Sequence, residues 1–113
     1  MNDCIFCKII NKTIPSDIVV ESENVIVIKD IAPKASLHLL IIPKKHIKDI
    51  VSFEHRDFEL GSQMLLMAKF LSDKFDNAKN FRLVINNGVQ AGQAIFHVHM
   101  HFLSGDMSES TNL

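Results

Sequence analysis

The stretch "AIFHVHMHFL", residues 94–103, decides the fold, because three of the six histidines in the chain stand at alternate positions in it. Alternation has the period of a β-strand, so His97, His99 and His101 are expected to share one face of a strand, with apolar side chains on the other. At ~3.3 Å per residue the outer two would lie roughly 13 Å apart, too far for one straight strand to chelate a single metal ion three times. The competing interpretation is an edge strand with exposed polar residues.

A row of imidazoles suits chemistry on an anion. Free histidine has a pKa of about 6.5, so neutral and protonated rings can coexist near neutral pH. A neutral ring can attack phosphorus, and a protonated neighbour can hold phosphoryl oxygens. The preceding loop, "NNGVQAGQA" at residues 86–94, contains two of the four glycines and offers backbone N–H groups for an anion. Together, loop and histidines predict a phosphate-binding active site.

The composition is that of a folded protein with one domain, residues 1–113. Hydrophobic residues make up 47% and charged residues 22% of the 113 residues, and the net charge is −1. This charge balance argues against nucleic acid or a membrane surface as the partner. The sequence has no apolar run of membrane-spanning length and no signal-peptide pattern at its start, so a cytoplasmic location is expected. The polar residues 104–113 are expected to form a flexible tail.

Hydrophobic periodicity predicts the remaining elements. A short N-terminal helix or turn is expected at residues 4–11, a hairpin of strands at 17–22 and 24–30, a buried strand at 36–43, a long helix at about 54–77 and a strand at 80–88. These elements predict an α+β fold with a mainly antiparallel five-stranded sheet, one long helix and a short N-terminal helix. The apolar stripe of the long helix is wider than one sheet face needs, which suggests a second surface such as a subunit interface.

Cys4 and Cys7 have the spacing of a zinc half-site. Since cytosolic thiols stay reduced, a metal pair or a redox pair is favoured over a structural disulfide. A thioredoxin-like dithiol would need a βαβ context that the sequence lacks, and idle cysteines are the remaining alternative. With no second cysteine pair in the chain, the other metal ligands would have to be histidines.

At these residues the sequence resembles the histidine triad (HIT) family, and most closely its Hint-like branch. The signature His-φ-His-φ-His-φφ is met by residues 97–103. The similarity extends to "IFCKIINKTIPS" (5–16), "IKDIAPKASLHLLIIPKKHI" (28–47) and "NNGVQAGQAIFH" (86–97), so it covers nearly the whole chain.

The resemblance implies a homodimeric hydrolase or nucleotidyl transferase that acts at the α-phosphate of purine nucleoside 5′-phosphoramidates or related adenylates. By position, His99 would be the nucleophile and form a covalent nucleotidyl intermediate. His101 would contact the phosphoryl oxygens and help the leaving group depart, while His97 and His38 would support the site. Two alternatives are cleavage of dinucleoside polyphosphates and a zinc-stabilised nucleotide-binding module with negligible turnover.

The resemblance also implies binding residues for the nucleotide. The purine slot would be lined by Ile5, Phe6, Ile9, Ile28 and Ile31, Asp30 would bond the ribose hydroxyls, and the phosphate would be surrounded by Asn86, Gly92, Gln93 and Ala94. By themselves, the five apolar residues look like ordinary core, Asp30 like a turn former and Asn86 like a turn cap. Many Hint-like members have Ser at the position of Ala94, so a hydroxyl near the leaving group is absent here.

Some bacterial members of the family bind zinc, and the resemblance implies the full ligand set. Cys4 and Cys7 would be joined by His46 and His97. A Cys2His2 site is closed, so one structural Zn²⁺ per chain is expected.

Overall fold

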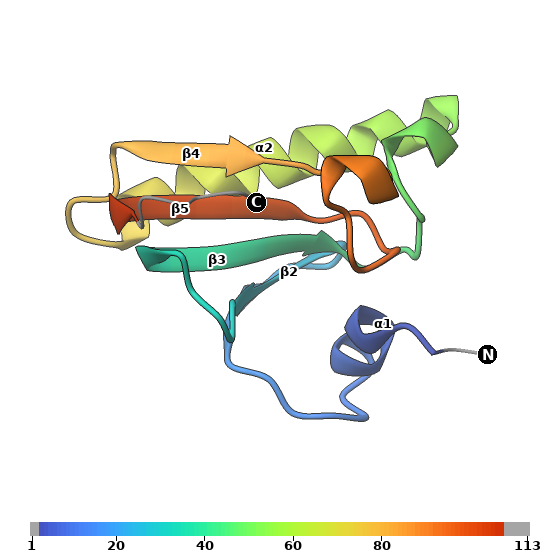
Figure 1. Ribbon diagram of the computed structural model, residues 1–113, viewed down its shortest axis with the longest axis horizontal. Helices are drawn as coiled ribbons and strands as arrows, with labels where there is room; N and C mark the ends of the chain where they lie inside the picture. Colours follow the sequence, from blue (N-terminus) through green and yellow to red (C-terminus); the bar gives the residue numbers. More distant parts are fainter. Residues whose placement is uncertain (1–2, 108–113) are drawn as a thin grey trace.

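The protein, described over residues 3–107 by a computed structural model, is a five-stranded sheet between two helices of unequal length (Figure 1). All neighbouring strands pair antiparallel, in the order β1-β2-β3-β5-β4. The strands are β1 (Ile18–Glu21), β2 (Val25–Lys29), β3 (Ala35–Pro43), β4 (Phe81–Val84) and β5 (Met100–Met107). The helices are α1 (Ile5–Ile10) and α2 (Phe58–Lys74), with short 3-10 turns η1 (Ile50–Ser52), η2 (His55–Asp57) and η3 (Val89–Ala91). The predicted α+β fold is confirmed.

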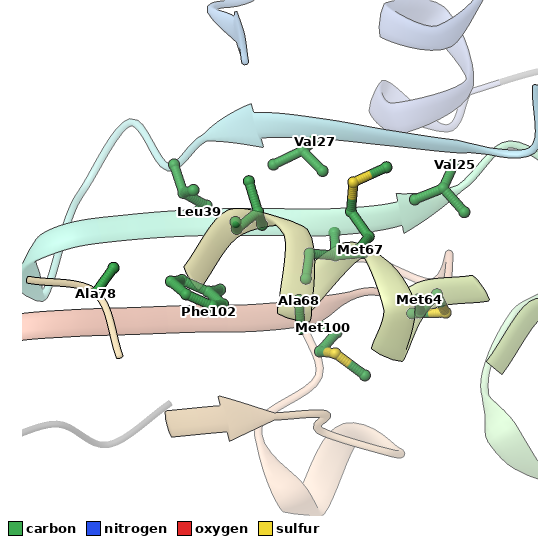
Figure 2. Close-up of a cluster of buried hydrophobic side chains, with 11 residues drawn as sticks. Val25, Val27, Leu39, Met64, Met67, Ala68, Ala78, Met100 and Phe102 are labelled. Atoms are coloured by element: carbon green, nitrogen blue, oxygen red, sulfur yellow. The ribbon is translucent and has the colours of Figure 1, made fainter. Parts of the chain in front are cut away.

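The long helix α2 covers one face of the sheet (Figure 2). Strand side chains at alternate positions point toward it, since successive residues of a strand face opposite ways. The buried strand residues on this face are Val25, Val27, Leu39, Ile41, Met100 and Phe102. The helix contributes Met64, Met67, Ala68 and Leu71. The methionines fill the core, as expected of flexible thioether side chains.

The short helix α1 covers the opposite face. Its Phe6 and Ile9 pack on the other set of alternate strand residues, Ile26, Ile28, Leu40 and Ile42. The central strand β3 is therefore buried on both faces, as its continuous apolar run predicts. His38 and His101 belong to this second face, because Leu40 pairs with His101 and His38 pairs with Leu103 in the β3–β5 register.

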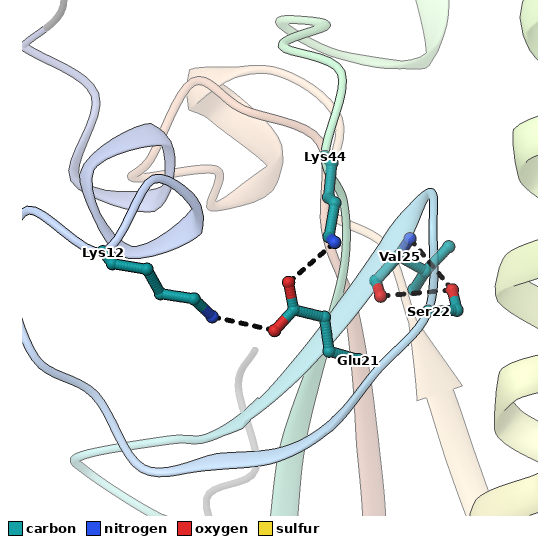
Figure 3. A network of polar contacts seen from close by, with 5 residues as sticks. All are labelled: Lys12, Glu21, Ser22, Val25 and Lys44. Atoms are coloured by element: carbon teal, nitrogen blue, oxygen red, sulfur yellow. Dashed lines mark hydrogen bonds and ion pairs between the residues drawn. The ribbon is translucent and has the colours of Figure 1, made fainter.

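Ion pairs hold the chain after α1 against the edge of the sheet (Figure 3). Glu21, at the end of β1, accepts from Lys12 at 2.8 Å and from Lys44, just beyond β3, at 2.7 Å. The two ammonium groups lower the pKa of Glu21. The adjoining turn is closed by Ser22, whose hydroxyl accepts from Val25 N–H at 3.1 Å. The placement of α1 thus has support that is independent of the cysteines.

Two predicted element boundaries differ from the structure. The long helix begins at Phe58, four residues later than expected, because Asp57 accepts from Glu54 N–H at 2.9 Å and closes a separate 3-10 turn. It ends at Lys74, where Phe75 is extended, three residues before the expected end. The predicted strand at 80–88 ends at Val84.

The histidine strand is also displaced from its expected position. It begins only at Met100, so the prediction that His97, His99 and His101 lie on one straight strand is wrong. It continues to Met107, so residues 104–107 of the expected tail are strand, whereas 108–113 lie outside the described residues. Within residues 3–107, no helix is both long enough and apolar enough to cross a lipid bilayer.

Candidate active site and metal centre

Four histidine rings lie along the α1 face of the sheet: three follow one another directly, and Phe6 connects the fourth, His97, to them. The ring centroids of His38 and His101 are 5.2 Å apart, and those of His101 and His99 are also 5.2 Å apart. Phe6 from α1 packs edge-on against His99 at 5.1 Å and against His97 at 5.8 Å. The irregular backbone before Met100 turns His97 away from the other two triad members and toward the cysteines.

Backbone contacts assign the protons of His38 and His101. Lys34 N–H donates to His38 Nδ1 at 3.0 Å, so in the neutral ring of His38 the proton is on Nε2. That Nε2–H lies 2.9 Å from His101 Nδ1, which must therefore accept. The proton of His101 is then on its own Nε2. His101 is left with one N–H donor for an external oxygen.

The same reasoning gives His99 the opposite tautomer. Its Nδ1 lies 2.8 Å from the carbonyl oxygen of His97, which can only accept, so Nδ1 carries the proton. The Nε2 of His99 is then unprotonated, and its lone pair has no hydrogen-bond partner among residues 3–107. Within residues 3–107, no buried side-chain nitrogen or oxygen lacks a partner, so this lone pair reaches open space. A free imidazole lone pair is what nucleophilic attack requires.

Burial keeps these rings neutral. Desolvation lowers the pKa of His99 and of His38, and it lowers the pKa of His101 to about 4. For His99 and His38 the nearby Asp30 carboxylate opposes this shift. The row therefore holds neutral imidazoles at physiological pH, in place of the mixture of charged and neutral rings that the sequence suggested.

A cavity of about 220 Å³ opens onto the row. It is lined by Phe6, Asp30, Lys34, Leu40, Asn86, Gly92, Ala94, Ile95, His99 and His101. Three of these, Lys34, Leu40 and Ile95, were not predicted from the sequence. Of these three, only Lys34 could have been suggested by the sequence, because it is a cation that lies between Asp30 and His38 in the chain. The lining combines an apolar side, a carboxylate and an N–H-bearing loop, which are the groups that recognise a nucleotide.

The loop between β4 and β5 supplies one wall of the cavity. Gly88 and Gly92 have positive φ angles of 94° and 98°, which favour glycine, and they flank the turn η3. Gln93 is buried and does not line the cavity: its amide donates to the carbonyls of Lys48 and Ile95, and its oxygen accepts from Gly88 N–H. Gln93 therefore shapes the loop, whereas Asn86, Gly92 and Ala94 face the cavity.

The five residues of the expected purine slot lie in four different environments. Phe6 lines the cavity, while Ile9 and Ile28 are buried beneath it in the α1 core. Ile31 is 98% exposed, an unusual environment for isoleucine. Ile5 is half-exposed and lines a neighbouring cavity of about 510 Å³ that shares Ala94 and Ile95 with the first. The core interpretation holds for Ile9 and Ile28.

Cys4, Cys7, His46 and His97 meet at the other end of the row. Their ligand atoms all lie within 4.8 Å of one another. The Nδ1 atoms of His46 and His97 are 3.1 Å apart, and sulfur–nitrogen distances run from 3.3 Å (Cys7–His46) through 3.4 Å (Cys4–His97) to 3.6 Å (Cys7–His97). Tetrahedral zinc with ordinary bond lengths has nitrogen–nitrogen edges of about 3.3 Å and sulfur–nitrogen edges of about 3.6 Å. The donor set fits a zinc ion.

The proton position of His97 agrees with this role. Its Nε2 lies 2.7 Å from the Pro43 carbonyl oxygen and must donate to it, which leaves the Nδ1 lone pair facing the two sulfurs. Such a hydrogen bond on the second ring nitrogen is typical of metal-binding histidines. Desolvation lowers the pKa of His97 to about 4, which favours the neutral ring. Burial, together with the neighbouring Cys4, raises the pKa of the Cys7 thiol to about 11, so metal binding would release its proton.

A second group of potential ligands, Asp30, His38 and His101, also comes together. Because Lys34 N–H occupies Nδ1 of His38, the Nε2 of that ring bears a proton and cannot ligate a metal. Proton positions therefore separate a metal end of the row from a phosphate end.

Comparisons with known proteins agree with this geometry. The family model described as scavenger mRNA decapping enzyme C-term binding matches residues 3–112. A protein of Chlamydia muridarum, named an uncharacterized HIT-like protein, is 44% identical over 103 residues, which cover 91% of this chain and 82% of that protein.

Solved structures of HIT family hydrolases are similar to this chain as well. A HIT family hydrolase from Legionella pneumophila matches with a TM-score of 0.90 at 38% identity, over 98% of this chain and all of that one. Another from Clostridium thermocellum matches with a TM-score of 0.89 at 42% identity, over 93% of this chain and 92% of that chain. The fold and the site thus define a histidine triad protein. The chain belongs to the HIT family, and it has the fold of the HIT family hydrolases.

Proposed function

We propose that the protein hydrolyses purine nucleoside 5′-phosphoramidates or related adenylates, through a covalent nucleotidyl intermediate on His99. The observation that carries this proposal is the tautomer of His99. Its Nδ1–H is held by the His97 carbonyl at 2.8 Å, so its Nε2 lone pair is free at a cavity that also contains a carboxylate and a glycine-containing loop.

In the first step, the Nε2 lone pair of His99 forms a bond to the α-phosphorus as the bond to the leaving nitrogen breaks. The leaving nitrogen takes a proton from water and departs as an amine. The ring of His99 becomes cationic, and its Nδ1–H bond to the His97 carbonyl stabilises the new charge. In the second step, a water molecule attacks phosphorus and gives its proton to the hydroxide left by the first step. The His99–phosphorus bond breaks with its electron pair returning to Nε2, and the nucleoside monophosphate leaves with the water oxygen.

Other cavity residues would bind the nucleotide. The Nε2–H of His101 would donate to a phosphoryl oxygen, with its direction set by His38 at 2.9 Å. Asp30 would accept from the ribose hydroxyls, and Phe6 would contact the purine. Asn86, Gly92 and Ala94 would line the phosphate end.

Zinc would be held by Cys4, Cys7, His46 and His97, where it would supply a structural cross-link and no open coordination position. The ligands come from the start of α1, from the segment after β3 and from the segment before β5. The metal would thereby join the N-terminal segment to the end of the sheet.

The test is a His99→Ala variant assayed for AMP release from adenosine 5′-phosphoramidate. We expect turnover to fall at least about a thousandfold, as for loss of other enzymatic nucleophiles. Mass spectrometry of wild-type enzyme quenched early in turnover should show an AMP adduct on His99. His55→Ala, which changes an exposed histidine of η2, is the matched control and should retain full activity. Normal turnover by His99→Ala, or nucleotide binding without any adduct, would contradict the proposal.

We also propose that the protein is a homodimer. Leu65, Leu66 and Phe70 on α2 remain 55%, 65% and 48% exposed. These side chains belong to the part of the apolar stripe on the long helix that is not needed to cover the sheet. Apolar side chains gathered in this way on a helix favour a protein interface.

A further inference from the structure

We infer that the metal site positions the nucleophile: the ion bound by Cys4, Cys7, His46 and His97 keeps the His97 carbonyl in place, and that carbonyl holds His99 in its reactive tautomer. The inference rests on the proposed function, because it assigns to His97 a positioning role toward the His99 imidazole. It goes beyond that function because it predicts that a structural metal affects the rate of the reaction although the metal does not contact the substrate.

His97 connects the candidate metal site with the nucleophile. Its side chain is fully buried. Its Nδ1 faces Cys4 at 3.4 Å and His46 at 3.1 Å, and its Nε2–H donates to Pro43. Its carbonyl oxygen accepts from His99 Nδ1 at 2.8 Å. One residue would therefore ligate the metal through its ring and orient the nucleophile through its backbone carbonyl, with only its own buried side chain between the two contacts.

Residues 97–99 are buried, but few backbone hydrogen bonds fix them. They precede β5, which begins at Met100, so strand pairing does not fix their backbone. One bond, from Val98 N–H to the Ile47 carbonyl at 2.7 Å, ties them to the segment after β3. The His97 ring, bonded to the Pro43 carbonyl, is a second anchor, and the Val98 side chain is buried. A metal that clamps this ring would fix the direction of the His97 carbonyl.

The helix α1 provides a second connection between the cysteines and the nucleophile. In the sequence, Phe6 lies between Cys4 and Cys7. Its ring packs against both His97 and His99 and also lines the cavity. A helix of only six residues has no stability of its own, so its position depends on what it is attached to. Metal binding at Cys4 and Cys7 would hold Phe6 against the nucleophile.

The protein should remain folded without the ion. The α1 core and the pairs of Glu21 with Lys12 and Lys44 hold the N-terminal segment independently of the cysteines. Loss of the metal is therefore expected to loosen residues 97–99 locally. Metal-free and zinc-loaded protein can therefore be compared in the same fold.

The experiment compares zinc-loaded protein, protein stripped with a chelator, and stripped protein reloaded with zinc. The main readout is the nitrogen-15 NMR spectrum of the His99 ring, which reports its tautomer without any turnover. We expect a single Nδ1–H tautomer with zinc and a mixture without it. The single-turnover rate of adduct formation should fall about 10–100-fold in parallel, as for loss of other groups that orient metal ligands.

Two variants give an independent comparison. His46 is exposed and does not line the 220 Å³ cavity, so changing it leaves the nucleotide contacts intact. His46→Ala should lose zinc and show the mixed tautomer. His46→Cys, which replaces Cys2His2 by the Cys3His set that zinc also accepts, should restore both zinc and the single tautomer. His55→Ala should behave as wild type in every measurement.

Stripped protein with an unchanged His99 tautomer and an unchanged rate would overturn the inference and leave the proposed function standing. Normal turnover by His99→Ala would instead overturn the proposed function, while the tautomer comparison would still test the coupling. The stripped wild-type protein supplies the metal-free state even where a His46 variant folds poorly or keeps its zinc.

Discussion

At the scale of single residues, the position of one proton on each ring divides the histidines into different roles. His97 and His101 both carry their proton on Nε2, because Nδ1 of His97 faces the thiols and Nδ1 of His101 accepts from His38. His99 carries its proton on Nδ1, because the His97 carbonyl can only accept. The residue types are identical, so their roles depend on which backbone or side-chain atom each ring meets.

Ala94 offers a test at this scale. It lines the main cavity, and Ala94→Ser would place a hydroxyl donor near the phosphate end. A neutral hydrogen bond contributes about 0.5–1.5 kcal/mol, so one formed only in the transition state should raise the turnover of phosphoramidates up to about tenfold. The comparison is kcat/KM on adenosine 5′-phosphoramidate, with Ala91→Ser in the same loop as the control. An unchanged value would show that the added hydroxyl does not reach the reacting atoms.

The sequence predicted part of the site at this scale. It predicted all four residues of the candidate metal cluster. It also predicted six residues of the cavity that contribute polar groups or loop backbone: Asp30, Asn86, Gly92, Ala94, His99 and His101. It did not predict that Gln93 turns inward or that Lys34 orients His38 through its backbone N–H. Backbone hydrogen bonds of this kind have no residue-type signature, since every residue except proline carries the same N–H group.

At the scale of elements, the segment from Asn86 to Ile95 is a loop whose shape depends on one buried side chain. Gln93 makes three hydrogen bonds across the loop, to Gly88, Lys48 and Ile95. With these bonds the loop presents Asn86, Gly92 and Ala94 to the cavity.

Gln93→Leu should therefore damage both stability and binding. It leaves buried backbone groups without partners, and each such group costs about 1–3 kcal/mol. We expect the free energy of unfolding in urea to fall by at least about 1 kcal/mol and AMP to bind more weakly. The control is Gln90→Leu, an exposed glutamine of the same loop. Equal stabilities of the two variants would mean that Gln93 does not brace the loop.

Element types were predictable here, and element ends were not. Strong periodicity located α2 and the buried strand β3. The onset of β5 was misplaced, because alternating histidines have the pattern of a strand even where the backbone bends to deliver His97 to the metal ligands. The start of α2 was misplaced because the Glu54–Asp57 turn forms its own capped unit.

At the scale of the whole molecule, the two faces of the sheet have different tasks. The α2 face contains the larger apolar core, whereas the α1 face contains the histidine row, the cavity and the candidate metal ligands. The candidate active site and metal cluster therefore both lie on the side that the short helix covers. The outer side of α2 remains available for a second copy of the chain.

The dimer can be tested directly on that helix. Leu65→Glu combined with Leu66→Glu adds charge to an apolar surface, and a buried interface cannot accommodate unpaired charge. Sedimentation equilibrium should give wild type twice the 12.8 kDa mass of one chain and give the double variant the monomer mass. Ser62→Glu, on an exposed position of the same helix, is the control. A monomeric wild type at micromolar concentration would refute the dimer.

The sequence alone determined the fold class and the residue types of the candidate metal cluster and active site, because these follow from hydrophobic periodicity and from the chemistry of side chains. Tertiary structure alone decided which lone pair of each histidine is free. That choice depends on atoms brought from distant segments: Pro43 beside His97, Lys34 beside His38, and the bend that turns the His97 carbonyl toward His99. The proton assignments of the site are therefore a property of the folded chain.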